Sequence, residues 1–384
     1  MMIYKNAMIH DGLGHAFVGD LRIEDGKIAE VAEHIEGDGV DLAGKHVLPG
    51  FIDTLSKWGI NGTPYEIRPS SDDNDEKSDP VTPEMDVVYA FNGRAASVQQ
   101  LPAYGITACG VAPSDSNVFG GQAAAFVTDG INGYRMCLRR GVAMKCSVSK
   151  EVKRVYGGRN VMPTTLMGMF HLLESNLRKA AEYDPEKEGV EPDEKLAAIR
   201  MAIDGEMPMM ISCDDANSRQ LVMEIVKPYE KMKVIFTMMA GLSELDLTLD
   251  PERVSFIDGF AGGDSDPRSM HKDYRIIKAL VDKGMRIAVC GKTAGSYSRE
   301  WVLWEGMELT KHIDDEEKVL SMMTSEPARM LGIDEMTGSI EVGKRADLVV
   351  WSMNPLSDFR ARVLQTMIAG KTVYQEGDEI KCYC

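Results

Sequence analysis

One apolar stretch, Leu48-Pro-Gly-Phe-Ile-Asp-Thr-Leu-Ser-Lys-Trp-Gly59, restricts the fold more than any other part of the sequence. A short apolar run of this kind is typical of a buried strand. The run ends in Leu55 and Lys57. A leucine offers no lone pair and an ammonium group repels cations, so neither side chain is a metal ligand. The sequence therefore predicts a buried strand that ends in an apolar and a cationic side chain.

Short apolar runs alternate with longer helical patterns through the middle of the chain, as a parallel barrel requires. The predicted strands are 47–53, 105–112, 143–148, 209–213, 233–238, 254–259 and 286–291, and the clearest helices are 165–183, 217–231, 271–283 and 315–331. We therefore expect the α/β class, with a distorted TIM (β/α)8 barrel over residues 50–337.

Both ends of the chain have strand-like patterns instead. A hairpin is predicted at Leu21 to Val31, because Asp25-Gly26 separates two alternating segments. Strand-like segments return after residue 338. We expect residues 1–49 and 338–384 to form one small β-sandwich domain.

Signatures at both ends of the predicted barrel resemble the amidohydrolase superfamily. Leu48 to Gly59 is similar to that family's first barrel strand, which normally ends Pro-Gly-Phe-Ile-Asp-x-His-x-His. The segment from Glu326 to Ser352 is similar to its last helix and the following strand. Internal segments resemble loops of the imidazolonepropionase-like subgroup; they are 79–83, 116–122 and 153–157. The resemblance implies hydrolysis of non-peptide C–N bonds in small cyclic or linear amides.

The resemblance also implies a catalytic divalent metal, but the family's ligand positions carry other residues here. They are Leu55 and Lys57 on the first strand, Lys150 after the fourth, Ser212 and Asp214 on the fifth, Met238 on the sixth and Lys292 on the eighth. None of the seven histidines ends a predicted barrel strand. We therefore predict no metal and no other cofactor. A shift of one residue in the fourth-strand alignment would place Glu151 at the site instead of Lys150.

The lysines among these replacements, Lys57, Lys150 and Lys292, should point toward the vacated metal centre, with Asp214 as a pairing carboxylate. One interpretation is a structural salt-bridge cluster, and another is a cationic pocket for a small carboxylate or phosphate. A third is chemical: crowded ammonium groups lower the pKa of at least one, and a neutral lysine forms a Schiff base with a carbonyl compound.

The predicted ligand-binding residues are Leu55, Ser212 and Met238 at the strand ends and a loop at the same face that carries Asn117, Gly121 and Gln122. A tight turn that requires glycine is the alternative explanation of this loop.

Composition excludes some partners. The net charge of −17 argues against nucleic acid and anionic membranes, both of which need clustered cations. Seven scattered cysteines without framework spacing indicate free thiols in a reducing compartment. With no apolar stretch approaching 18 residues, we expect a cytoplasmic protein.

Three functions remain open, in this order. The first is a non-hydrolytic protein with a lysine-lined pocket for a small anion. The second is a metal-independent enzyme that uses lysine and aspartate chemistry on a small amide or carbonyl compound. The third is a metal-dependent amidohydrolase with unusual ligands such as Glu151, Asp214 and Asp215. The expected partner is a small molecule, and both a homo-oligomer and pairing with an active paralogue stay open.

Overall fold

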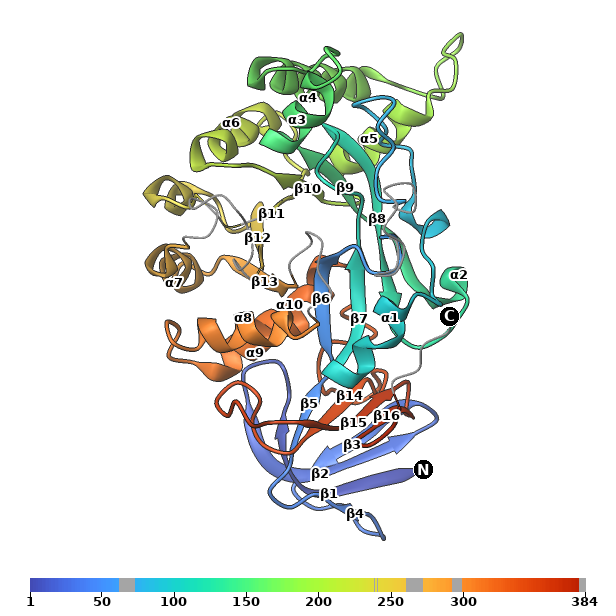
Figure 1. Ribbon diagram of the computed structural model, residues 1–384, viewed down its shortest axis with the longest axis vertical. Helices are drawn as coiled ribbons and strands as arrows, with labels where there is room; N and C mark the ends of the chain where they lie inside the picture. The colour runs from blue at the N-terminus through green and yellow to red at the C-terminus, as the bar shows by residue number, and fades with distance from the viewer. Residues whose placement is uncertain (62–72, 238, 240, 260–271, 292–298, 380–384) are drawn as a thin grey trace.

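The computed structural model describes residues 1–61, 73–237, 239, 241–259, 272–291 and 299–379. Two sheets organise these residues, one forming a barrel and the other a smaller domain below it in Figure 1. Among the described helices, none is both long and apolar enough to cross a membrane.

The barrel sheet has the strand order β13-β12-β11-β10-β9-β8-β7-β6. Its strands are β6 (Phe51–Ser56), β7 (Ile106–Val111), β8 (Phe119–Val127), β9 (Cys137–Ser147), β10 (Met209–Ser212), β11 (Val234–Thr237), β12 (Val254–Gly259) and β13 (Arg286–Cys290). Neighbouring strands are parallel except at β8, which runs antiparallel to both β7 and β9. Side chains join the two ends of the sheet: Thr54 Oγ1 donates to Val289 O at 2.7 Å, and Asp53 Oδ1 accepts from Gly291 N at 2.8 Å. The result is a distorted TIM barrel, as predicted.

All seven predicted strands are present, but β8 was missed, and the loop expected at Gly121 and Gln122 is instead part of this strand. Gly121 has φ +124, and a Cβ there would lie 2.6 Å from Met85 O. Gln122 N donates to the same carbonyl at 2.7 Å. Glycine is therefore required because the Met85 backbone crosses close to the strand, and not because the chain turns there.

Helices cover the outside of the barrel (Figure 1). They are α1 (Ala96–Gln99), α2 (Gly133–Met136), α3 (Lys150–Gly157), α4 (Leu166–Glu182), α5 (Glu194–Ile203), α6 (Ala216–Val226), α7 (Tyr274–Asp282), α8 (Trp301–Leu309), α9 (Glu316–Met323) and α10 (Ser325–Met330), with 3-10 turns η2 (Val87–Tyr89), η3 (Leu101–Tyr104) and η4 (Glu244–Thr248). The helix predicted over 315–331 is divided at Thr324 into α9 and α10. Pro327 explains the break, because a proline inside one continuous helix lacks the amide hydrogen and clashes with the preceding turn.

Both ends of the chain contribute to the second sheet. Its strands are β1 (Met2–His10), β2 (Ala16–Glu24), β3 (Lys27–Ala32), β4 (Val40–Asp41), β5 (His46–Pro49), β14 (Leu348–Trp351), β15 (Val363–Ile368) and β16 (Lys371–Gln375). They follow the order β16-β15-β14-β5-β1-β2-β3, and β4 pairs with β1. The predicted hairpin is confirmed, with Asp25 at φ 49 and Gly26 at φ 78 between β2 and β3.

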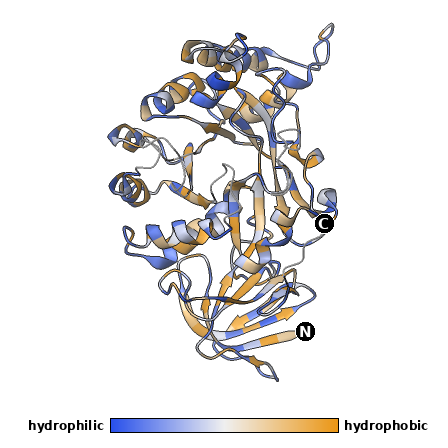
Figure 2. Cartoon of the chain, in the orientation of Figure 1, coloured by the Kyte–Doolittle hydropathy of each residue, from blue (hydrophilic) through white to orange (hydrophobic). Residues whose placement is uncertain are grey.

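The barrel strands contact apolar residues on both sides. Ile52, Ile235 and Ile257 belong to a core inside the barrel, whereas Phe51, Phe236 and Phe256 pack outward against the helices. Figure 2 shows the barrel strands mainly in hydrophobic colours, while the surrounding helices carry hydrophilic segments. Because both faces of the barrel sheet are buried, polar side chains gather at the ends of its strands.

Candidate functional site

The carboxyl ends of the parallel barrel strands meet at one mouth of the barrel, where this fold places its chemistry. Lys57 directly follows β6, Lys145 lies near the end of β9, Ser212 is the last residue of β10 and Thr237 is the last of β11. Asp115, in the loop after β7, lies among them. We call these five residues the mouth cluster.

Asp115 is the centre of the mouth cluster. Its Oδ1 accepts from the Lys145 ammonium, and it accepts from Ser212 Oγ at 2.5 Å. Lys145 also donates to Ser212 Oγ at 3.1 Å and to Cys146 O at 3.0 Å. Burial acts to raise the pKa of Asp115, but Lys145, Ser212 and Lys57 outweigh that effect, so the net result is a lowered pKa. This carboxylate is therefore held in its charged form.

Lys57 differs from Lys145 because its ammonium group makes no hydrogen bond or ion pair with another described residue. Burial lowers the pKa of its ammonium group, while Asp115 and Asp75 act in the opposite direction. Lys145 adds to the lowering because it is a like charge nearby. Lys57 is thus a strand-end amine with a weakened hold on its proton.

Lys150 and Asp214 lie at the rim. Lys150 is exposed at the start of α3, and its backbone N–H donates to Asp214 Oδ2 at 2.6 Å. Burial raises the pKa of Asp214, and the Lys150 charge opposes that rise. Glu151, which pairs with Arg154 at the surface, is among the charges that act on Lys57. The described residues therefore do not bring Lys150 together with Lys57, and Glu151 is the fourth-strand charge that acts on the mouth.

The predicted ligand-binding residues divide between two settings. Ser212 belongs to the mouth cluster, and Leu55 is 8% exposed in the core inside the barrel. Asn117 is 2% exposed and fully occupied: its amide donates to Glu76 O at 2.7 Å and Thr82 Oγ1 at 3.0 Å, and its carbonyl accepts from Tyr156 at 2.6 Å. Asn117 thus links the 76–82 segment to α3 through hydrogen bonds.

Gln122 N donates to Met85 O, and Gly121 leaves room for the Met85 backbone, so both residues position the neighbouring segment. Met238 and Lys292 lie outside the described residues. The predicted convergence of Lys57, Lys150 and Lys292 therefore stays a prediction, since Lys150 is exposed at the rim and Lys292 is not among the described residues.

Two members of the mouth cluster, Lys145 and Asp115, were not predicted. Lys145 interrupts the apolar run Ala143-Met-Lys-Cys146, and a charged residue inside a buried strand is the signal that could have found it. Asp115 sits in an ordinary polar loop, Ser114-Asp-Ser116, whose composition indicates only a turn.

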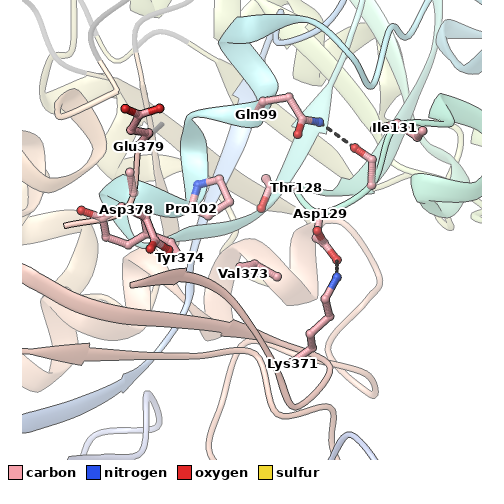
Figure 3. Close-up of a pocket in the computed structure, with 12 residues that line it drawn as sticks. Gln99, Pro102, Thr128, Asp129, Ile131, Lys371, Val373, Tyr374, Asp378 and Glu379 are labelled. Atoms are coloured by element: carbon pink, nitrogen blue, oxygen red, sulfur yellow. Dashed lines mark hydrogen bonds and ion pairs between the residues drawn. The ribbon is translucent and has the colours of Figure 1, made fainter. Parts of the chain in front are cut away.

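A separate cavity of about 580 Å³ lies between η3 and β16 (Figure 3). Gln99, Asp129 and Lys371 line it, and Lys371 lies 3.6 Å from Asp129. Thr128, also in its wall, donates to Ile106 O at the amino end of β7. The cavity is thus at the end of β7 opposite the mouth cluster and has no part in it.

Comparison with known proteins settles the family. The model of the Amidohydrolase family matches residues 122–373, which is more than half of the chain. The chain belongs to the amidohydrolase family. A crystal structure of an amidohydrolase from Thermotoga maritima MSB8 superposes with a TM-score of 0.89 at 25% identity, covering 98% of this chain and 100% of that one.

Two curated relatives match this chain over only part of their own length. Amidohydrolase tasK of Hapsidospora irregularis is 23% identical over 425 residues, which cover 95% of this chain and 41% of that protein. Imidazolonepropionase of Legionella pneumophila (strain Corby) is 37% identical over 98 residues, 24% of each protein. The matches span less than half of either relative's length, and the imidazolonepropionase likeness is confined to a short region.

The acidic side chains that could serve as alternative metal ligands in this amidohydrolase-family chain are engaged in contacts within the protein. Within the described ranges, no group of three or more His, Cys, Asp or Glu side chains is placed to hold a metal ion. The alternative ligands are engaged elsewhere: Asp215 caps α6 by accepting from Ser218 N, Glu151 pairs with Arg154, and Asp214 accepts from Lys150 N. No described histidine lies on a barrel strand.

Proposed function

We propose that this amidohydrolase-family protein acts without a metal and that Lys57 is a reactive amine for a small carbonyl compound. The observation that carries the proposal is the position of Lys57, a strand-end lysine with a lowered pKa and no hydrogen bond or ion pair among the described residues. Lysines of this kind are activated by desolvation and by neighbouring cations.

The charges around Lys57 favour this function over the cationic pocket that the sequence put first. Lys145 is paired with Asp115, so its ammonium group already has a carboxylate partner. Asp115, Asp75 and Glu151 all act on Lys57 as negative charges. Carboxylates at these positions oppose the entry of an anion, whereas they do not repel a neutral carbonyl group.

The chemistry needs no external oxidant or reductant. The uncharged Lys57 Nζ adds to the carbonyl carbon, a proton moves from nitrogen to the former carbonyl oxygen, and loss of water leaves an imine. The attacking nitrogen carries a positive charge before it loses its proton. A charged carboxylate such as Asp115, held beside Lys145, stabilises that positive charge.

Reductive trapping tests the proposal. The protein is incubated with propionaldehyde and cyanoborohydride, and the modified lysines are located by peptide mass spectrometry. We expect preferential labelling of Lys57 near neutral pH, lost in Lys57→Ala and retained in Lys150→Ala, whose side chain is exposed at the rim. Uniform labelling of surface lysines, with Lys57 no faster than Lys150, would contradict the proposal.

A second candidate is non-hydrolytic binding of a small anion at the same lysine. The Lys57 ammonium makes no hydrogen bond or ion pair with another described residue, which favours this candidate because an incoming anion would supply a counter-charge. Calorimetry with inorganic phosphate separates the two candidates. Phosphate binding that is lost in Lys57→Ala, together with no reductive labelling, would select the anion site.

A further inference from the structure

A second pocket opens at the other end of the barrel. It has a volume of about 310 Å³ and is lined by residues at or near the amino ends of β10 to β13, together with α10 and the start of β9. The mouth cluster lies at the carboxyl ends of the same parallel strands. The two sites are therefore on opposite faces of the barrel.

Cations border this pocket. Its lining includes Arg139, Lys233, Arg253, Arg286 and Arg329, against the two carboxylates Glu206 and Glu252. Lys233 and Arg253 directly precede β11 and β12, and Arg286 is the first residue of β13. Three successive parallel strands thus begin with a cation. This gathering is unexpected in a chain whose net charge is −17.

Most of these cations are oriented without being neutralised. Arg139 donates to Gly332 O at 2.7 Å, Lys233 donates to Glu252 O at 2.5 Å, and Arg253 donates to Val226 O at 3.1 Å and Tyr229 O at 2.9 Å. These acceptors are backbone carbonyls, which carry no net charge. Of the five lining cations, Arg329 has a carboxylate partner in the described structure, Glu326 at 2.9 Å.

Two side-chain donors of residues that line the pocket have no partner in the described structure. The Arg286 guanidinium is exposed and makes no hydrogen bond or ion pair with another described residue. The Nε of Arg253 is buried and also has no hydrogen-bond partner among the described residues. An unsatisfied buried donor is costly, and an acceptor that reaches it recovers that cost.

The remaining walls are apolar. Val142, Ile235, Met330 and Leu331 line the pocket and also belong to the core inside the barrel. A site with an apolar floor and cations at its edge suits a molecule that carries both an apolar body and an anionic group. Inorganic anions alone would leave the apolar walls uncovered.

We infer that this pocket is a second binding site, which takes a small organic anion such as a phosphate monoester or a carboxylate that carries an aromatic or aliphatic group. The anionic group lies against Arg286, Lys233 and Arg253, and the apolar body covers Ile235 and Leu331. The inference is independent of the chemistry proposed at Lys57, because the two sites share no residue.

The test is calorimetric titration with phenyl phosphate, which carries both an apolar ring and an anionic group. Phenol, which has only the ring, and inorganic phosphate, which has only the anion, are titrated for comparison. We expect phenyl phosphate to bind more tightly than either partial probe. Arg286→Ala should weaken it about tenfold, and a double Lys233→Ala/Arg286→Ala variant should weaken it further, since hydrogen bonds to charged groups are among the stronger ones. Both side chains are exposed, so these variants should fold.

Matched controls keep the result specific. Lys187→Ala removes an exposed lysine that does not line the pocket and should leave the affinity unchanged. Lys57→Ala should also leave it unchanged, which separates this site from the one at the mouth. Phenol binding as tightly as phenyl phosphate, an affinity unaffected by the double variant, or no heat at about 10 mM ligand would overturn the inference.

Discussion

The Lys145 ammonium contacts the Asp115 carboxylate inside the barrel mouth, and the two residues are unequally buried. The Lys145 side chain is 2% exposed, whereas that of Asp115 is 23% exposed. Lys145 therefore depends on Asp115 for its counter-charge, while water can partly solvate Asp115 without Lys145. The pair therefore places one buried cation and one partly solvated carboxylate at the barrel mouth.

The unequal burial gives a prediction. Asp115→Asn leaves a buried ammonium without a carboxylate and should cost about 3 kcal/mol of unfolding free energy. Lys145→Met removes the buried charge itself and should cost less. Urea unfolding of the two variants measures the difference, and a larger loss in Lys145→Met would show that the pair is not held in this way.

Chelation is the second test. Because the described strand ends do not supply a metal donor set, we expect the melting temperature to be the same with and without EDTA. A bound metal would stabilise the folded state by linkage, so its removal would lower the melting temperature. A fall of several degrees that zinc restores would contradict the metal-free proposal. Hydrolysis of imidazolonepropionate should likewise stay below detection with or without EDTA.

Much of the fold followed from the sequence because buried parallel strands are apolar on both faces. The runs at β10 to β13 show this pattern directly, and all were predicted. β8 was not, because its residues Gly120-Gly-Gln-Ala-Ala-Ala125 have low strand propensity and the strand is fixed by pairing with β7 and β9. In such segments, pairing with neighbouring strands and not local propensity decides whether a strand forms.

The candidate site was less predictable than the fold. Alignment of strand ends located Lys57 and Ser212, because register along a strand can be counted from its sequence. It could not locate Asp115, whose position depends on the path of a loop. Nor could it show that Lys150 is exposed where α3 begins, since one residue of shift at a helix start rotates a side chain from the barrel to solvent.

Two buried acids, Asp53 and Glu305, should contribute less stability as pH rises from about 4 to about 8. Burial raises the pKa of Asp53 to about 7, against hydrogen bonds from Gly291 N and Trp58, and burial raises the pKa of Glu305 to about 8. Both acids bind their protons more tightly when folded, so their stabilising effect is complete below their unfolded pKa values. It is lost as pH rises through the folded values.

A single variant isolates the Asp53 contribution. Asp53→Asn removes the titrating group, so its melting temperature should change less between pH 5 and pH 8 than that of the unmodified protein. The difference corresponds to at most about 4 kcal/mol for a shift of this size. Identical pH profiles for the two proteins would rule out Asp53 as a titrating group in this range.

The last prediction concerns the buried ion pair that connects α6 and η4. Arg219 is 1% exposed and binds Asp246, which is fully buried, through Nε at 2.6 Å and a terminal nitrogen at 2.8 Å. Arg219→Met would leave the carboxylate with the Ser243 N–H as its remaining described donor. We expect a loss of about 3–5 kcal/mol in urea unfolding, because a buried charge loses its partner.

Two comparisons make this last test specific. The double variant Arg219→Met/Asp246→Leu removes both charges and should be more stable than Arg219→Met alone, since no unpaired charge stays buried. The matched control is Arg275→Ala, whose side chain is exposed and pairs with Asp273 at 2.8 Å. Solvent replaces that contact, so its unfolding midpoint should not move. If the double variant were no more stable than Arg219→Met, the cost would come from lost packing of the arginine stem and not from the isolated carboxylate.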